Sequence, residues 1–430
     1  MASGARAGRK PARLLVLIFG VAALATLAAV FLGPRISASQ AAPEELSNAE
    51  LLASVARAAD APPEFGATVT VEQDLIPTQL LNSMAGGNQG GPGLASAPQT
   101  ARVWYGGEDR VRAELLGKNG DKVFVKNGEK ASFYDGATNT LRAGTVPGES
   151  RPVETVEAVS PAEVDKMLAR LGETSDLDQA EPTTFEGRGA HVLTLTPKQP
   201  GSTQVARAQA LVDSETYLPL RFLLFADGTE EPVLSYEVSG LDVGPVPAER
   251  FELQTPPGAE VLPLKPDQGG PESLTPNEKR EGGPTGAPTG APAGEAREVA
   301  GVAEARESVD FGVRQLGEVP GDRALEGAYL TPGGGVVLAY GSGWGTIVLS
   351  QEPGEGAATL PAIPGATMPE GGGTGEAPQL PAVDLGDGVE AREFSTPVGT
   401  ALLWSDNGVS YALAGSVPGA ELERAARGLR

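Results

Sequence analysis

The 430-residue sequence contains no cysteine and a single histidine, His191. Without cysteine the chain can form no disulfide, no thiolate metal site, no cysteine nucleophile and no lipid-modified cysteine anchor. One imidazole leaves little room for a Ser-His-Asp triad or for a histidine-based metal site. These absences favour a non-catalytic protein that needs no metal or other cofactor.

Basic residues are also scarce, since 33 Lys and Arg stand against 56 Asp and Glu, for a formal net charge of −23 at pH 7. A nucleic-acid-binding protein needs basic surfaces that neutralise phosphates, so nucleic acid is excluded as a partner. The chain has 58 glycines and 37 prolines, which together make about 22 % of its residues. This fraction is below the roughly 25–30 % that marks a wholly disordered protein. We therefore expect folded domains that are separated by flexible segments.

The first 35 residues contain no acid, and four basic residues precede an uncharged run at 14–32. A helix of this length spans about 28 Å at about 1.5 Å per residue, close to the thickness of a bilayer core. The run therefore predicts a single transmembrane helix, with residues 1–13 in the cytoplasm and the bulk of the chain extracytoplasmic. In the alternative, the small residues up to Ala41 form a signal cleavage site and the protein is secreted.

Glycine and proline mark the domain boundaries. They interrupt residues 265–305 every few positions, which is typical of a flexible linker. A second such stretch, 352–381, lies between predicted strands and is expected to be a disordered loop within a domain. The sequence thus predicts a larger domain at 42–264 and a smaller one at 306–430.

Apolar and polar residues alternate in the larger domain around Val69, Val111 and Leu234, which predicts antiparallel strands with one apolar face. Capping boxes at Ser47 and Ser160 predict two amphipathic helices, the second of which ends at Gly172. In the smaller domain the pattern predicts strands at 336–340, 346–350, 401–405 and 409–414 and a helix at 421–429. The fold class is therefore mainly β (α+β).

No motif in the sequence indicates catalysis. His191 shares a strand with Leu193 and Leu195, so we interpret it as a structural residue. The segment 341–345 lacks the spacing of a dinucleotide-binding loop and leads into a strand, which favours a hairpin turn. Four lysines, at 118, 122, 126 and 130, are interpreted as protection of a sheet edge, with a docking site for an anionic headgroup or an acidic partner as the alternative.

An antiparallel sheet that is half closed by helices forms an apolar trough, which can hold an apolar ligand. The aromatic residues at 104, 105, 133 and 134 belong either to the core or to the lining of such a cavity. The predicted ligand-binding residues of the trough are Val69, Val71, Val103, Tyr105, Val111, Val123, Val125, Leu193, Phe222, Leu234 and Tyr236.

Four segments, at 45–52, 125–139, 211–222 and 251–261, resemble in this order the motifs of the LolA-like superfamily. This superfamily includes lipoprotein carriers, mycobacterial lipid-binding lipoproteins and the N-terminal domain of RseB, and the chain looks most like the membrane-anchored forms of high-GC Gram-positive bacteria. The resemblance covers residues 44–263 and implies an incomplete antiparallel β-barrel that is covered by helices and has a cavity for acyl chains. The C-terminal segment resembles a small domain of unknown function that is found beside such modules.

The resemblance implies a membrane-anchored, extracytoplasmic protein of the cell envelope that binds lipid or lipoprotein acyl chains. The alternative is an RseB-like regulator that binds a membrane anti-sigma factor and senses envelope stress, in which case sigma factor regulation passes through that partner. A hydrolase is the third alternative, and loss of activity on mutation of His191 would support it. An anchored chain cannot shuttle across a periplasm as the soluble carriers do.

Overall fold

The computed structural model describes residues 46–75, 99–118, 120–145, 168–169, 171–199, 201–264, 297–331, 333–354 and 380–429. The predicted membrane helix at 14–32 and the cleavage site near Ala41 lie outside these residues, as do most of the linker 265–305 and of the loop 352–381. None of the helices within the described ranges is both long enough and apolar enough to cross a bilayer.

The described part of the N-terminal domain forms one twelve-stranded sheet, in the order β12-β6-β5-β4-β3-β2-β1-β11-β10-β9-β8-β7. Neighbouring strands are antiparallel except for β12, which pairs parallel to β6. The strands are β1 Phe65–Gln73, β2 Gln99–Tyr105, β3 Arg110–Leu116, β4 Lys122–Asn127, β5 Lys130–Asp135, β6 Thr140–Thr145, β7 Ser175–Phe185, β8 Arg188–Pro197, β9 Val205–Asp213, β10 Pro219–Ala226, β11 Leu234–Val243 and β12 Glu260–Pro263.

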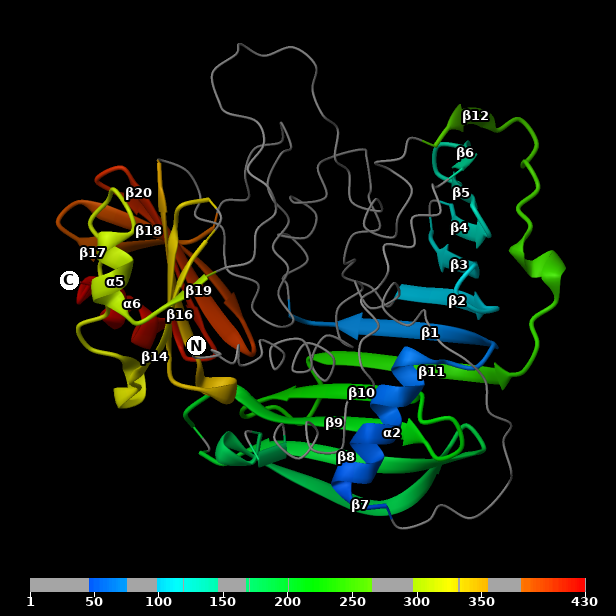
Figure 1. The fold of residues 1–430 in the computed structure, drawn as a ribbon, viewed down its shortest axis with the longest axis horizontal. Helices are drawn as coiled ribbons and strands as arrows, with labels where there is room; N and C mark the ends of the chain where they lie inside the picture. Colours follow the sequence, from blue (N-terminus) through cyan, green and yellow to red (C-terminus); the bar gives the residue numbers. More distant parts are fainter. Residues whose placement is uncertain are drawn as a thin grey trace, which may run out of the picture.

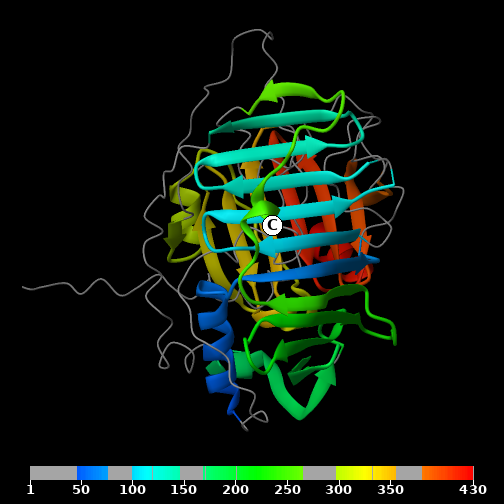
Figure 2. The same cartoon turned by 90° about the vertical axis from the view of Figure 1, so that its right-hand side faces the viewer.

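The large sheet bends near β1 and β11, so that β2 to β6 form one wall and β7 to β10 form the other (Figure 1). It is an open sheet with two edges, β12 and β7, and not a closed barrel. The 3₁₀ helix η3 (Ala248–Phe251) and the chain on both sides of it cross the outer surface of the β2–β6 wall (Figure 2). The prediction of a mainly β fold is confirmed.

Helix α2 (Asn48–Asp60) begins at the predicted capping box. The Ser47 Oγ accepts a hydrogen bond from the Glu50 amide, and the Glu50 carboxylate accepts one from the Ser47 amide at 2.9 Å. Leu51, which is fully buried, packs against Leu193 and Val212, so the helix lies on the inner side of the sheet. Most of the second predicted helix lies outside the described residues, although positions 168–169 and 171–174 are helical.

In its described residues, the C-terminal domain forms a second sheet of eight strands, in the order β13-β14-β15-β16-β20-β19-β18-β17. Its elements are β13 Arg297–Val299, α5 Val302–Glu307, η6 Pro320–Asp322, β14 Leu325–Leu330, β15 Val336–Tyr340, η7 Gly343–Gly345, β16 Ile347–Pro353, β17 Ala382–Gly386, β18 Val389–Thr396, β19 Gly399–Asp406, β20 Val409–Gly415 and α6 Gly419–Arg427. All four predicted strands and the terminal helix are present. The described residues of this domain start at Arg297, so β13 and most of α5 occupy residues that the composition assigned to the linker.

Candidate functional site

One surface of the large sheet, on the inner side of its bend, is apolar across seven strands from β3 to β8. Residues that lie opposite one another in a ladder share a face of the sheet. Val71 lies opposite Tyr236, Tyr236 opposite Phe222, and Phe222 opposite Ala210. This apolar inner face consists of Phe65, Ala67, Val69, Val71, Ala101, Val103, Tyr105, Val111, Ala113, Leu115, Leu193, Leu195, Ala208, Ala210, Phe222, Leu224, Leu234, Tyr236 and Val238. At about 4.8 Å between strands, it extends about 29 Å along the sheet.

Nine of the eleven predicted trough residues belong to the apolar inner face, where they lie on six different strands. The nine are Val69, Val71, Val103, Tyr105, Val111, Leu193, Phe222, Leu234 and Tyr236. That these nine bind a ligand stays a prediction.

Val123 and Val125 do not share the apolar inner face. The ladder places them opposite Glu114 and Arg112, which are on the outer side of β3. They pack instead under Phe251 of the outer segment, whose side chain is 1 % exposed. On β4 the inner positions are taken by Phe124 and two lysines.

The two tyrosines of the apolar inner face are held in a strongly desolvated environment. Tyr105 is 1 % exposed, and burial, together with the nearby carboxylates of Glu108 and Glu64, raises its pKa to about 12. Burial also raises the pKa of Tyr236 to about 12. Both phenols are therefore neutral at any physiological pH, and the surface carries no charge at these positions.

The apolar character ends at β4, where Lys122 lies opposite Leu115 and Lys126 lies opposite Val111. The Lys122 ammonium is 3.8 Å from an Asp135 carboxylate oxygen, and that of Lys126 is 3.4 Å from Asp109. Strand β4 is the fourth strand from the β12 edge of the sheet. The interpretation as edge protection is therefore wrong for Lys122, Lys126 and Lys130, because β4 and β5 each have a hydrogen-bonded neighbour on both sides.

At the other wall, helix α2 covers the end of the apolar inner face. Leu51 and Val55 of the helix belong to one hydrophobic cluster with Leu193. The Asn48 side-chain amide also donates a hydrogen bond to the Leu177 carbonyl at 3.0 Å, which fixes the helix to the edge strand β7. The helix thus closes the inner side of the sheet at β7, β8 and β9.

His191 lies on the inner side of β8, opposite Val212, and is 1 % exposed. Its ring stacks on Tyr217 with 6.4 Å between centroids. Burial lowers the His191 pKa, which the charge of Asp213 only partly offsets. Within the described part of the chain its Nδ1 has no hydrogen-bond partner, so the geometry offers no base-and-nucleophile pair.

Beside it, Asp213 is fully buried and is held by two parallel hydrogen bonds from Arg188, of 2.8 and 2.9 Å. Its Oδ2 also accepts hydrogen bonds from the Thr216 amide and hydroxyl. Burial raises the Asp213 pKa, but these hydrogen bonds and the Arg188 charge outweigh burial and hold that pKa below its usual value. The pair ties the β9–β10 turn to β8 and is a structural ion pair.

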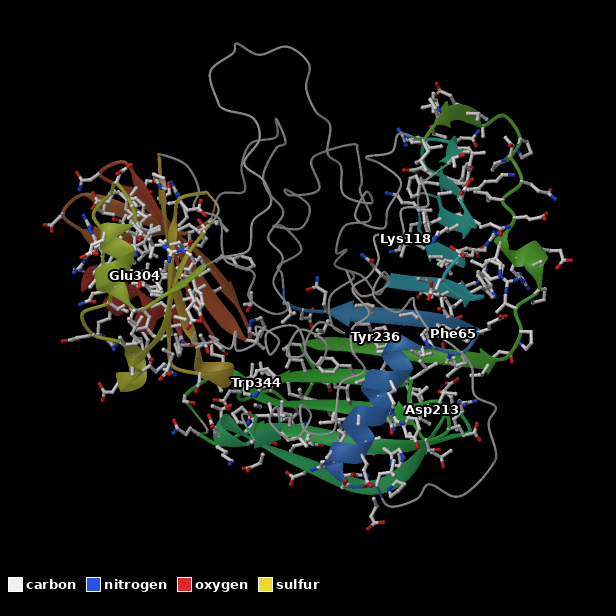
Figure 3. All side chains as sticks on the ribbon, viewed as in Figure 1. Phe65, Lys118, Asp213, Tyr236, Glu304 and Trp344 are labelled. Carbon is white, nitrogen blue, oxygen red and sulfur yellow. The ribbon has the colours of Figure 1, made fainter. Side chains whose placement is uncertain are left out.

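The apolar inner face also receives one side chain from the C-terminal domain. Trp344 lies in η7, the turn between β15 and β16, and packs against Ala208, Phe222 and Leu234. Its indole N–H donates a hydrogen bond to the hydroxyl of Ser175 at 3.2 Å. Figure 3 shows Trp344 and Asp213 toward opposite ends of β9 and β10, with Tyr236 between them in this view.

Polar contacts join the two domains around this turn. The hydroxyls of Thr203 and Ser416 are 2.6 Å apart, and the Gln204 amide donates to the Ser416 carbonyl at 3.0 Å. Arg323 donates a hydrogen bond to the Ser202 carbonyl. Gly343 has a φ of +63°, and a Cβ added there would lie 2.7 Å from the Thr174 Cβ, so only glycine permits this close approach.

A separate hollow of about 380 Å³ lies on the outer side of the sheet, between β1, β2 and the segment that precedes η3. The indole of Trp104 forms part of it, with the guanidinium of Arg250 5.1 Å and that of Arg112 5.9 Å from the ring. Arg112 is also paired with Glu114 at 2.6 Å. The hollow is on the opposite side of the sheet from the apolar inner face and shares no predicted trough residue.

The described residues include no group of three or more His, Asp or Glu side chains that could hold a metal ion. The sequence predicted a hairpin turn at 341–345, and η7 lies in the turn between β15 and β16 at this place. The sequence did not predict that Trp344 of this turn contacts the other domain. A large aromatic residue alone between glycines was the available signal, because such a side chain seldom points into solvent without a partner.

No family model matches the chain, and no curated protein matches it. Solved structures that are similar to it include MucB in complex with MucA(peri), at 16 % identity and a TM-score of 0.38 over 89 % of this chain and 98 % of that one. A MucA/MucB complex from Pseudomonas aeruginosa matches at 16 % identity and a TM-score of 0.37, with the same coverage. The LolA superfamily protein NE2245 from Nitrosomonas europaea matches at 9 % identity and a TM-score of 0.19, over 48 % of this chain and 98 % of that one. MucB and a LolA superfamily protein are thus among the solved structures to which the chain is similar.

Proposed function

We propose that this chain is a non-catalytic binding protein that holds a lipid, or the acyl chains of a lipoprotein, on the apolar inner face. The observation that carries the proposal is the packing of Trp344 against the cluster of Ala208, Phe222 and Leu234, because it is an apolar group from another domain that this surface accommodates. An acyl chain of ~16 carbons gains a gross ~13 kcal/mol on burial at ~0.8 kcal/mol per methylene. That is enough for binding once the ordering of the chain is subtracted.

The proposed location is the outer side of the cell membrane, with the run at 14–32 as a retained anchor. The basic residues before this run favour a cytoplasmic N-terminus. Intact-mass measurement of the chain purified from membranes tests this, since a retained anchor gives the full-length mass. A chain that begins near Ala42 would support the secreted alternative.

The binding proposal is tested by native mass spectrometry of the full chain, purified from a lipid-containing host and extracted afterwards with solvent. We expect a lipid at one copy per chain. Val71→Asn and Phe222→Asn each place an amide on the apolar inner face, and we expect both to lower the bound fraction at least tenfold, because a buried amide without a partner disfavours an apolar neighbour.

Val125→Asn is the matched control. It introduces the same amide at a buried valine of the outer side, and we expect it to retain the lipid while its melting temperature falls as much as that of the other two variants. Equal loss of lipid in all three variants would show that the loss follows from reduced stability and would contradict the assignment of the site.

The alternative function, a regulator that binds a membrane anti-sigma factor and senses envelope stress, is one outcome of the same experiment. A folded chain that carries no lipid and takes up none would contradict the binding proposal. Recovery of a membrane protein with an anti-sigma domain after cross-linking in the native host would then favour the regulator.

A further inference from the structure

Trp344 occupies part of the surface that the proposed function gives to the ligand. Its side chain packs against the hydrophobic cluster of Ala208, Phe222 and Leu234, and all three belong to the apolar inner face. The ring is anchored there because its N–H donates to the Ser175 hydroxyl, which is 1 % exposed. An acyl chain that covers Phe222 and Leu234 cannot contact the same atoms while the indole is in place.

The hydrogen bonds between the described residues of the two domains, apart from that of Trp344, are of a kind that water can replace. The Thr203 and Ser416 hydroxyls, the Gln204 amide and the Arg323 guanidinium form hydrogen bonds across the interface. Such bonds contribute little net free energy, because their groups bind water when the domains separate. Among the described residues, Trp344 is the one apolar side chain of the C-terminal domain in the hydrophobic clusters of the large sheet.

We infer that the ligand and Trp344 compete for the same part of the apolar inner face, so that ligand binding releases the C-terminal domain from the large sheet. The inference rests on the proposed function. The docked domain is then an autoinhibitory contact, and the freed β15–β16 turn with its exposed indole is the signal that the ligand produces. Because the two equilibria are linked, whatever stabilises docking weakens ligand binding by the same factor.

The first test compares binding of a fluorescent fatty acid, 11-(dansylamino)undecanoic acid, to the delipidated full chain held in amphipol and to two variants. We expect Trp344→Ala to bind this probe about tenfold more tightly, since the competing group is gone. The control is Leu325→Ala, which removes a large apolar side chain of the same domain that is 37 % exposed and belongs to none of the hydrophobic clusters of the large sheet. We expect it to leave the affinity unchanged.

The second test uses the absence of cysteine from the chain. The Thr203 and Ser416 hydroxyls are 2.6 Å apart, so a Thr203→Cys/Ser416→Cys variant places two thiols within reach of a disulfide. Oxidation locks the docked arrangement and reduction releases it in the same protein. We expect the oxidised form to bind the probe about tenfold more weakly than the reduced form, and each single-cysteine variant to show no such redox dependence.

The third measurement follows domain release directly by hydrogen exchange. The Gln204 amide donates to the Ser416 carbonyl only when the domains are docked, so we expect saturating probe to accelerate its exchange at least tenfold. Two results would overturn the inference and leave the proposed function standing. One is that Trp344→Ala binds the probe no more tightly than the wild type, and the other is that the locked and reduced forms bind the probe equally. Absence of probe binding in every form would overturn both.

Discussion

His191 is the residue at which pH should act on this protein most directly. Burial lowers its pKa from 6.5 in the folded state, so between pH 6.5 and the lower folded value the unfolded chain binds more protons. Stability is therefore complete above about pH 7 and decreases as the pH falls through this window, by up to about 1.4 kcal/mol per pH unit. The charged groups beside the ring, Asp213 and Arg188, stay ionised throughout it.

We expect urea unfolding between pH 7.5 and 5.5 to show this decrease for the wild type and a flatter profile for His191→Gln. The comparison is clean because the chain has one histidine. Parallel profiles for the two proteins would contradict the assignment. A second set of curves near pH 4 reports carboxylates instead, since the Asp213 pKa lies below its usual 3.8 and its stabilisation is lost as the pH falls through that range.

Removal of one partner of the Arg188–Asp213 pair should be among the most damaging changes to the N-terminal domain. Asp213 is fully buried, so Arg188→Ala leaves a carboxylate without its cation, at a cost of about 3–5 kcal/mol in the free energy of unfolding. The control is Arg221→Ala, whose ion pair with Glu237 has both side chains about 40 % exposed. We expect the control to lose no more than about 1 kcal/mol, and equal losses in thermal or urea unfolding would contradict this account.

At the scale of elements, Phe251 is the most deeply buried apolar side chain of the outer segment that carries η3. Phe251 is 1 % exposed and packs on Val123 and Val125, and Gly106 leaves room for its ring, since a Cβ there would be 2.7 Å from the Phe251 Cζ. We expect Phe251→Ala to lower the free energy of unfolding by about 3–5 kcal/mol. Ligand binding should persist in calorimetry below the melting temperature, because the segment is on the outer side. Loss of binding in the folded variant would place the site there.

Alternation within a strand predicted the strands around Val69, Val111 and Leu234 but not the side on which each apolar row lies. In residues 122–127 both sides carry apolar residues, Val123 and Val125 on one and Phe124 on the other. Only the pairing of β4 with β3 determines which of these two sides faces the inner surface of the sheet, and that pairing is a property of the fold. Strand β7, SDLDQAEPTTF, was missed since it has no alternation, contains a proline and is largely exposed. The parallel pairing of β12 with β6 depends on tertiary contact and has no local sequence signal.

At the scale of the whole molecule, the sequence predicted two folded domains, but its one signal for their contact was the position of Trp344 between glycines. Composition predicts the boundary, because glycine and proline interrupt 265–305. The contact depends on a few residues, Trp344 among them, that converge from distant positions in the chain. Their spacing in sequence follows no period, so that only the folded arrangement brings Ser175, Ser416 and Trp344 to one interface.

These contacts should hold the two domains together even when the chain between them is cut. A specific protease site inserted between Pro284 and Thr285 allows cleavage in the predicted linker, after which the interface alone opposes separation of the halves. We expect the cleaved halves to coelute in size-exclusion chromatography at micromolar concentration, and the Trp344→Ala halves to require an at least tenfold higher concentration to do so. Leu325→Ala is the matched control and should behave as the wild type. Halves that separate equally in all three proteins would show that the Trp344 contact contributes nothing measurable to docking.

The same cleaved protein also tests the competition between ligand and docked domain. If the cleaved halves of the wild type separate when the fatty acid probe is added, the competition extends to two separate chains, because the ligand then opposes an association that no linker assists.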